Sequence, residues 1–454
     1  MATLADMELL VWPRGSTTPE RVDKWVSYQV NWSLFNADNF TASIPATKIN
    51  RALFKGGGQK FQIKCSGALQ FTGLIDERSD DTSTSATDLH VSGRDFQGLL
   101  MDVPVPYDRR SILNQTLLQI ATRWTVDIWP EYIYSVVTNQ AGSRYIAAGG
   151  SKSTTKVNTG GTALADNAVR LSDGSYIFKT PPKAKAVFKP FGKNAPQYAG
   201  TGQEQIRNTK VQTGISIWAA LQDLAAQIGA HCWMSVDGAL IISRPDYTFS
   251  SSAYGRGIEL GWDRKANRST GGNVSGVTFE TSTAARFSEY RVTGVGKSKK
   301  KSKKAELLLD GGTIKDPGPA FWDALGSPST WTKRLYKPGI IAGKGIRNIN
   351  HLTRFARRYV CDKMLGGYSL DYKLNGHHAP SGALWTHDTT VRVNDERNEI
   401  NDVLYIVGGS RSYSMTDGKH TVLKPWPTYV WLAYDDPGTS SDEWHAKMAT
   451  KVDW

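Results

Sequence analysis

The segment from Leu89 to Asp102 (LHVSGRDFQGLLMD) constrains the fold more strongly than any other part of the chain. Apolar residues alternate with polar ones along its first half, which is the pattern of a half-buried β-strand. The alternation stops at Gly93, Arg94 and Asp95, and a short apolar stretch that ends in Asp102 follows directly. We therefore predict a strand that leaves a sheet here and enters a turn with a fixed exit angle.

Polar residues at this exit are candidates for fixing that angle. Asp95 could cap the turn that follows it or pair with Arg94, and Asp102 could cap the segment before Pro104. The alternative is a salt bridge from Arg94 to another subunit, which assembly of a charge-swapped Arg94 variant would exclude. Gly93, Arg94, Asp95 and Asp102 are therefore the structural or interface candidates in this part of the chain.

Short β-like runs fill the sequence before this exit. Apolar residues recur close to every second position between Trp25 and Leu34, and similar runs lie between Phe40 and Ile75. Gly56 to Gly58 precede the predicted strand Lys60 to Cys65 rather than a helix, which indicates a hairpin tip and not a phosphate-binding loop. Residues 1–105 are therefore predicted to form a small antiparallel barrel or sandwich.

A change of period marks a second unit at residues 106–245. Ser111 is the expected N-cap of a helix whose apolar residues recur at helical spacing: Ile112, Leu113, Leu117, Ile120, Ala121 and Trp124. A second helix over residues 217–228 ends at Gly229, and residues 233–243 form a predicted hairpin around Asp237-Gly238. A long polar insertion at residues 139–213 separates the two helices, and we expect part of it to be ordered only against a neighbour.

Strands return in residues 246–432. Strands are predicted at Val277 to Thr281 and Glu289 to Gly296, a polar insertion spans residues 297–344, and a helix covers Asn350 to Met364. Four further strands are predicted at Tyr368 to Leu374, Thr389 to Asn394, Val403 to Gly408 and His420 to Leu423. The second half of the chain is therefore expected to repeat the barrel-like sheet of the first.

The last segment, residues 433–454, is rich in aromatic and turn-forming residues. Trp431, Trp444 and Trp454 are among the 15 tryptophans of the chain. They could fill the edge of a core, or they could belong to an extended arm that anchors in a neighbouring subunit, because aromatic side chains concentrate binding energy at interfaces. We favour the arm, and the interface candidates are Trp444 and Trp454 within it and Trp431 just before it.

The bulk composition restricts the environment and the partners. The formal net charge is +13, and much of the excess lies in Lys297 to Lys304, which we interpret as a solvated loop or a contact with an anionic partner. Cys65, Cys232 and Cys361 are far apart and lack metal-ligand spacing, which predicts folding without disulfides in a reducing cytosol. We expect no signal peptide and no membrane span.

Catalytic motifs are missing from the sequence. There is no Gly-x-Ser-x-Gly elbow and no His-Glu-x-x-His helix, and paired acids such as Asp395 with Glu396 lie beside turn residues. His377, His378 and His387, with Asp388 nearby, could hold a metal only if a hairpin brought them together, and we favour a structural role near the turn. We therefore predict no catalytic residue, no cofactor and no metal.

Three of these patterns resemble one protein family. Gly93 to Asp95, followed by Leu-Leu-Met-Asp, resembles the end of the first domain in the tail hub (late control) proteins of contractile-tailed phages related to phage Mu. The helix at residues 217–228 with its following hairpin resembles the small α+β domain of that family. Arg286 to Gly296 resembles the strand that enters its second barrel.

The resemblance implies a mainly β fold with an α+β insertion, in which two tail-tube-like antiparallel β-barrel domains and small α+β domains form a homotrimeric ring. It also implies a virion structural protein made in the bacterial host cytoplasm. Such a baseplate hub would join a sixfold tail tube, or its initiator, to a threefold central spike, because three copies of two similar units give six near-equivalent surfaces. Further implied partners are the tape measure and baseplate wedge proteins, with DNA only in transit during injection.

Two other classes of function remain open from the residues alone. A tail-associated cell-envelope hydrolase or a carbohydrate-binding β protein would need a concave site with convergent acids or aromatics. A DNA-binding protein would show strongly salt-dependent retention on DNA. The mass of the isolated chain in solution separates the ring-forming hub from an active monomer.

Overall fold

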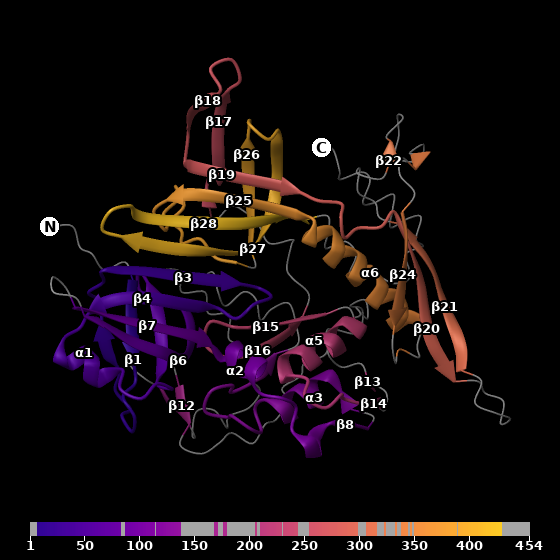
Figure 1. The fold of residues 1–454 in the computed structure, drawn as a ribbon, viewed down its shortest axis with the longest axis horizontal. Helices are drawn as coiled ribbons and strands as arrows, with labels where there is room; N and C mark the ends of the chain where they lie inside the picture. Colours follow the sequence, from indigo (N-terminus) through magenta and orange to yellow (C-terminus); the bar gives the residue numbers. More distant parts are fainter. Residues whose placement is uncertain are drawn as a thin grey trace.

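The computed structural model describes residues 7–82, 87–113, 115–137, 168–170, 176–178, 205–206, 209–228, 230–243, 254–297, 306–315, 322–323, 332–333, 337–343, 346, 349–387 and 389–428. The fold is mainly β, and most strand pairs are antiparallel, as the sequence predicts. Two β-sheet modules lie one above the other in Figure 1, and helical segments lie beside them.

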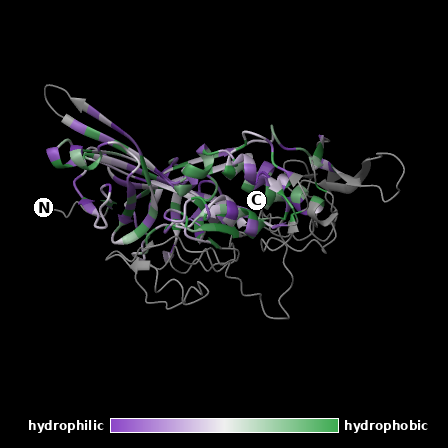
Figure 2. Ribbon diagram, turned by 90° about the horizontal axis from the view of Figure 1, so that it is seen from below, coloured by the Kyte–Doolittle hydropathy of each residue, from purple (hydrophilic) through white to green (hydrophobic). Residues whose placement is uncertain are grey.

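The first module is coloured indigo and purple in Figure 1. Its elements are β1 (Met7–Val11), β2 (Glu20–Val22), β3 (Ser27–Ser33), β4 (Asn39–Pro45), α1 (Lys48–Leu53), β5 (Lys60–Cys65), β6 (Ala68–Thr82) and β7 (Thr87–Asp95). The strands are hydrogen-bonded in the order β2-β1-β5-β6-β7-β4-β3. Hydrophilic and hydrophobic residues alternate along them, as Figure 2 shows, and the apolar face packs into one buried cluster.

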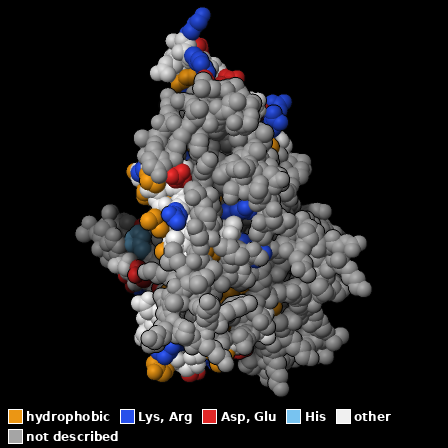
Figure 3. Space-filling view, turned by 90° about the vertical axis from the view of Figure 1, so that its right-hand side faces the viewer, with side chains coloured by type: hydrophobic (Ala, Val, Ile, Leu, Met, Phe, Trp, Pro, Cys, Tyr) orange, Lys and Arg blue, Asp and Glu red, His pale blue; other side chains and the backbone are white. Residues whose placement is uncertain are grey.

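The second module is coloured rose, orange and yellow in Figure 1. Its strands are β17 (Ile258–Asp263), β18 (Arg268–Gly272), β19 (Val274–Thr281), β25 (Tyr368–Asn375), β26 (Thr389–Asp395), β27 (Ile400–Ser414) and β28 (Gly418–Pro427). They pair in the order β18-β17-β26-β27-β28-β25-β19. The hairpin of β17 and β18 projects from the molecule and carries exposed Lys and Arg side chains at its end (Figure 3).

The two modules share one strand order. Each strand of the first module has a counterpart at the same place in the second, from β2 and β18 at one end to β3 and β19 at the other. The long strands β6 and β27 also have their irregularity at matching places, between Ile75 and Glu77 and between Ile406 and Gly408. The predicted repetition is therefore present as a repeated order of strands.

Buried residues occupy matching positions in the two ladders. When the ladders are aligned on these irregularities, Phe40 corresponds to Leu370 and Ile75 to Ile406, and all four side chains are buried. Two strands differ in direction. β1 pairs antiparallel with β5 whereas β17 pairs parallel with β26, and β2 and β18 follow as the antiparallel neighbours of β1 and β17. The repeat therefore preserves the position of every strand but not the direction of all of them.

The modules are joined edge to edge into one sheet of 14 strands through β27 and β3. The hydrogen-bonded ladder has free ends at β2, β18 and β19, and no ladder between described residues closes either module into a barrel. The expectation of two closed or nearly closed barrels is therefore not met at the level of backbone pairing. The modules are curved, open sheets that continue into each other.

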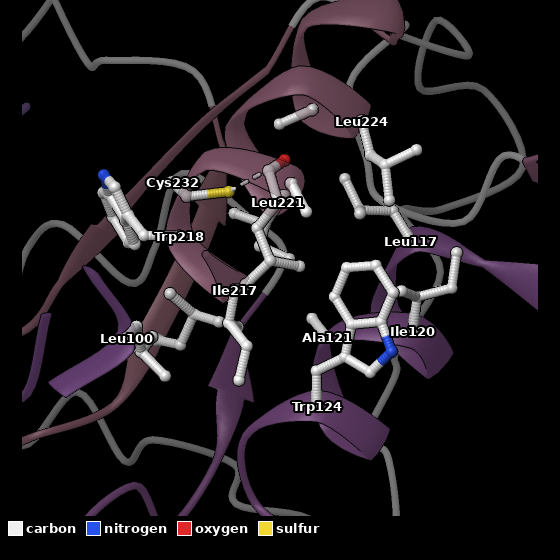
Figure 4. Packing of buried hydrophobic residues seen from close by; sticks show 14 of the residues in the cluster. Leu100, Leu117, Ile120, Ala121, Trp124, Ile217, Trp218, Leu221, Leu224 and Cys232 are labelled. Carbon is white, nitrogen blue, oxygen red and sulfur yellow. Dashed lines mark hydrogen bonds between the residues drawn. The ribbon is translucent and has the colours of Figure 1, made fainter. Parts of the chain in front are cut away.

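A small α+β unit follows the first module. Its main elements are α2 (Phe96–Asp102), α3 (Leu117–Trp124), α5 (Ile217–Gln227), β15 (His231–Met234) and β16 (Leu240–Ser243). Short strands complete it: β8 (Ser111–Ile112), β9 (Gln115–Thr116), β10 (Val136–Val137), β13 (Gln205–Ile206) and β14 (Thr209–Lys210). Figure 4 shows its packed apolar core, in which the Cys232 thiol points at the carbonyl oxygen of Leu221 (3.8 Å).

The first helix of this unit begins later than predicted. We expected Ser111 to be its N-cap, but Ser111 lies in β8 and pairs with β14. The helix begins at Leu117, where Thr116 accepts a hydrogen bond from the Gln119 backbone and the Gln119 side chain accepts one from Thr116. This reciprocal capping box outcompetes the isolated serine, because it satisfies two free N–H groups at once. The predicted second helix and the hairpin are confirmed as α5 and β15–β16.

An insertion separates β19 from β25 in the second module. It contains β20 (Glu289–Lys297), β21 (Glu306–Lys315), β24 (Pro338–Gly343) and α6 (Ile349–Gly366), and two short strands, β22 (Trp322–Asp323) and β23 (Thr332–Lys333), also lie in it. β20 pairs with β21 and β24 in a separate sheet, so our assignment of this strand to the second barrel is wrong. The polar stretch at 297–344 also contributes strands, whereas α6 matches the predicted helix.

Candidate functional site

The two modules contact each other through a pair of hydrogen-bonded strands. Seven residue pairs join β27 to β3 antiparallel, from Gly408 opposite Ser33 to Ser414 opposite Ser27. β27 can do this because it is 15 residues long: its first half pairs with β26, its second half with β3, and β28 covers most of its other edge. We call the β27–β3 contact the module junction.

A buried arginine stabilises the module junction. The Arg411 guanidinium lies 4.2 Å from the ring centroid of Trp32, donates to Gln70 Oε1 at 2.6 Å and also donates to the carbonyl oxygen of Trp385. Trp32 packs where Gly409 has no side chain, since a Cβ at Gly409 would lie 2.7 Å from the indole. The cation therefore connects β27, β3 and β6 by directional hydrogen bonds and a cation–π contact.

A second contact crosses the module junction near the hairpin end of β27. The Tyr28 hydroxyl lies 2.8 Å from His377 Nε2, and His377 Nδ1 lies 3.1 Å from the Thr421 hydroxyl. Tyr28 also stacks on Tyr413, with ring centroids 5.6 Å apart. His377 is thus a buried structural residue of the module junction, which agrees with the role favoured from the sequence.

Two buried carboxyl groups lie at the exit of the first module. Asp95 is the N-cap of α2, and its side chain accepts hydrogen bonds from the backbone of Gln97 (3.0 Å) and Gly98 (3.4 Å). Burial raises the pKa of Asp95 to about 7 in spite of these bonds. Burial and the nearby Asp95 carboxylate also raise the pKa of Asp38 well above its usual range.

Arg94 joins two elements on the surface beside this exit. Its guanidinium donates to Asp76 at 2.7 and 3.2 Å and to Asp102 at 3.1 and 2.6 Å. We expected Asp102 to cap the segment before Pro104, but its carboxylate instead accepts from Arg94, which lowers the pKa of Asp102. Arg94 thus pairs with Asp76 and Asp102, whereas the Asp95 carboxylate accepts hydrogen bonds from the backbone of α2. The long arginine reaches two strongly charged acceptors, a geometry that the sequence spacing does not reveal.

Gly93 lies where strands and aromatic rings meet closely. A Cβ at this position would lie 2.7 Å from a Phe61 ring carbon, 2.8 Å from the Leu74 carbonyl oxygen and 2.9 Å from a Phe40 ring carbon. No larger residue fits without movement of the core. Trp431, Trp444 and Trp454, the arm at 433–454 and residues 298–304 of the lysine run lie outside the described residues.

A polar hollow of about 850 Å³ lies on the face of the sheet beside the module junction. Many of its lining side chains are hydroxyl or amide groups from both modules: Ser27, Gln29, Thr41, Ser43, Ser79, Ser92, Ser412 and Ser414. Within the described ranges there is no group of three or more His, Cys, Asp or Glu side chains that could hold a metal ion. His387 is buried apart from the hollow, and burial lowers its pKa to about 4.

The sequence predictions missed the central residues of the module junction. Arg411 and Trp32 resemble ordinary strand residues, and nothing local indicates that they meet. The pair Gly408-Gly409 inside a strand was the available signal, because glycine in a strand interior often marks a bulge or a close approach of another segment. No helix in the described parts of the chain is long and apolar enough to cross a lipid bilayer.

The comparisons with known proteins agree with the resemblance seen in the sequence. Residues 362–425 match the sequence model of the C-terminal domain of NMB1110-like tail proteins. These residues run from the end of α6 to β28 and so include most of the second module. A search of curated protein sequences finds no match.

Solved tail proteins have the same fold over nearly the whole chain. The tail protein from Neisseria meningitidis MC58 is 21% identical, and the match covers 92% of this chain and 95% of that one with a TM-score of 0.60. The 43 kDa tail protein of prophage MuSo2 from Shewanella oneidensis is 16% identical, and the match covers 93% and 99% with a TM-score of 0.59. The predicted resemblance to tail proteins of Mu-like phages is therefore confirmed.

Proposed function

We propose that this chain is a structural hub subunit of a contractile phage tail and that three copies form a ring with pseudo-sixfold symmetry. The observation that carries the proposal is the repeat of one strand order in two modules that share a continuous sheet. Three chains contribute six such modules. A ring of them presents six near-equivalent surfaces while the assembly keeps threefold symmetry.

This arrangement suits a symmetry adaptor in the baseplate. One face of the ring would bind the sixfold tail tube or its initiator, and the other would bind the threefold central spike. The centre would enclose the passage for the tape measure protein and for DNA in transit, and baseplate wedge proteins would contact the outside. In this role the chain works by binding and not by turnover, and its place is the tail of the virion.

The chemistry of the described residues supports a binding role. The buried polar groups at the module junction are used for packing: His377 contacts Tyr28 and Thr421, and Arg411 contacts Gln70 and Trp32. The hollow beside the module junction is lined by hydroxyl and amide groups together with charged side chains of both signs, among them Asp76, Arg78 and Lys373, and all of these groups hydrate well. The luminal side of the ring is the position that fits such a surface.

The test is the mass and shape of the assembled protein. Light scattering of the purified full-length chain, alone and with its spike, should give a trimer, and electron microscopy of that trimer should show rings with six similar lobes. A chain that stays monomeric with and without the spike would refute the hub. Activity of such a monomer on purified cell wall would favour a tail-associated hydrolase.

A further inference from the structure

We infer that the free edge strand β19 of one copy pairs antiparallel with the outer half of β6, residues 76–82, of the next copy, and so repeats the module junction between chains. This inference rests on the proposed trimer and specifies its contact. The partner surface is a second copy of this chain, and the junction already present inside the chain provides the template.

The strands of the inferred contact are equivalent to those of the module junction. In the aligned ladders, β3 corresponds to β19 and β27 to β6. Alignment on the two bulges places Ser79 of β6 at the position of Ser410, and Glu280 of β19 at the position of Asn31. Ser410 and Asn31 are directly opposite each other in the module junction, so Ser79 and Glu280 are the corresponding pair between chains.

Both strand edges of the inferred contact are open among the described residues. In the module junction, the second half of β27 has β28 on one edge and β3 on the other. The outer half of β6 pairs with β7, and β19 pairs with β25, but across the described residues neither has a strand on its other edge. Unpaired strand edges bind another strand readily, and main-chain hydrogen bonds then supply affinity.

Equivalent side chains of β3 and β19 differ in burial. Tyr28 and Val30 of β3 are only 5% and 1% exposed, because β27 lies beside them. Their counterparts on β19, Val277 and Phe279, remain partly exposed. The apolar pair of β19 is partly exposed, whereas the equivalent pair of β3 is buried. This difference is expected if β19 lacks the neighbouring strand that β3 has.

Charged side chains on the outer half of β6 limit which strand can pair with it. The outer half of β6 reads Asp-Glu-Arg-Ser-Asp-Asp-Thr, and Arg78 is already paired with Asp80 at 2.5 Å. Charged side chains on an edge strand suppress indiscriminate pairing, because a wrong neighbour leaves them desolvated. The edge of β6 is therefore suited to one strand in one register. Repetition of this head-to-tail contact generates a ring if the rotation closes and a filament if it does not.

The experiment is disulfide cross-linking of the full-length chain at the inferred register. Ser79→Cys combined with Glu280→Cys should give covalently linked trimers under oxidising conditions, and neither single variant should do so. The matched control is Asn31→Cys with Ser410→Cys, whose cysteines oppose each other inside one chain and should close without a change in mass. Ser79→Cys with Thr278→Cys, shifted by two residues, should link poorly because the Cα atoms of such diagonal neighbours are about 7 to 8 Å apart. The native cysteines Cys65, Cys232 and Cys361 are buried.

The possible outcomes are distinct. Trimers by light scattering without the Ser79–Glu280 cross-link would overturn the inferred contact and leave the proposed hub standing. Linked dimers that grow no further would count against both the head-to-tail contact and the ring. Cross-linked chains longer than trimers would support the strand contact and count against the closed ring. A second variant, Phe279→Ser, alters a partly exposed side chain and should lose the trimer while the monomer keeps its far-ultraviolet circular dichroism; an unchanged trimer would contradict the inference.

Discussion

Strands β3 and β19 hold the same place in their modules but differ in what covers them. β3 is a central strand because β27 of the second module pairs with its outer edge, and Tyr28 and Val30 are buried as a result. β19 pairs on its inner side with β25, the counterpart of β4, and its apolar residues Val277 and Phe279 are only partly buried. Burial of a strand in this protein therefore depends on the adjoining module as much as on the strand itself.

Removal of the buried Arg411 cation should have the largest effect on the free energy of unfolding. Arg411→Met keeps most of the side-chain volume but leaves Gln70 and the Trp385 carbonyl without their donor, so we expect the free energy of unfolding to fall by about 3 to 5 kcal/mol. Arg78→Met, on the corresponding long strand β6, removes a partly exposed ion pair and should cost less than about 1 kcal/mol. Urea unfolding of the two variants measures the difference, and equal losses would show that the module junction does not depend on Arg411.

Truncation of equivalent core residues tests whether the two modules are energetically alike. Ile75 and Ile406 are the same residue at the same ladder position, 2% and 0% exposed. Each Ile→Ala change should lower the free energy of unfolding by about 2 to 5 kcal/mol. The two losses should add in the double variant, because the residues belong to different apolar clusters. Strong non-additivity in denaturant unfolding would show that the two cores are not independent.

Asp95, at the exit of the first module, should make the stability of the protein depend on pH. The pKa of Asp95 is about 7 in the folded chain and close to 4 when unfolded, so the folded state binds the extra proton. The stabilisation that this proton gives the folded state is therefore complete below a pH of about 4 and is lost as the pH rises through about 7. Asp95→Asn keeps a capping acceptor. Relative to wild type, its free energy of unfolding should rise by about 1 to 2 kcal/mol between a pH of about 4 and about 8.

Asp102 is the control for this measurement. Its folded pKa is lowered by Arg94, so its contribution has the opposite sign: it is present above a pH of about 4 and is lost as the pH falls. Asp102→Asn should therefore leave the profile between neutral pH and pH of about 8 unchanged. A flat difference between wild type and Asp95→Asn over the whole range would refute the assignment of a protonated carboxyl at the helix N-cap.

The smallest effect is expected from the surface ion pairs of Arg94. Its side chain is partly exposed and screened by water, so Arg94→Gln should lower the free energy of unfolding by about 0.5 to 1 kcal/mol, and added salt should reduce that loss. Assembly should be preserved, because both acceptors, Asp76 and Asp102, belong to the same chain. Loss of the trimer in the charge-swapped Arg94→Glu variant, with folding retained, would instead indicate an intersubunit contact.

Local patterns were sufficient where one segment determines its own structure. The alternation around Tyr28, Val30 and Trp32 predicts β3, and the helical spacing after residue 349 predicts α6, because a half-buried surface imposes its period on the sequence. The start of α3 was misplaced, since Ser111 and Thr116 are both acceptable caps and the deciding bond comes from the Gln119 side chain.

Long-range contacts could not be predicted in the same way. The module junction pairs β3 with β27, more than 370 residues later in the chain, and neither strand carries a mark of its partner. The strand β17 was missed, because Gly261 and its charged neighbours weaken the alternating pattern. β20 was assigned to the wrong sheet, because its apolar residues would suit either one.

The opposite directions of β1 and β17 have a consequence for how such chains diverge. A ladder can form with either strand direction, so a peripheral strand can be supplied from whichever end the preceding segment arrives. The α+β unit can therefore lead into the hairpin of β17 and β18 from a different side, while the other five strands of the second module keep their order. The connecting segment can therefore differ between the two modules while the order of the strands is kept.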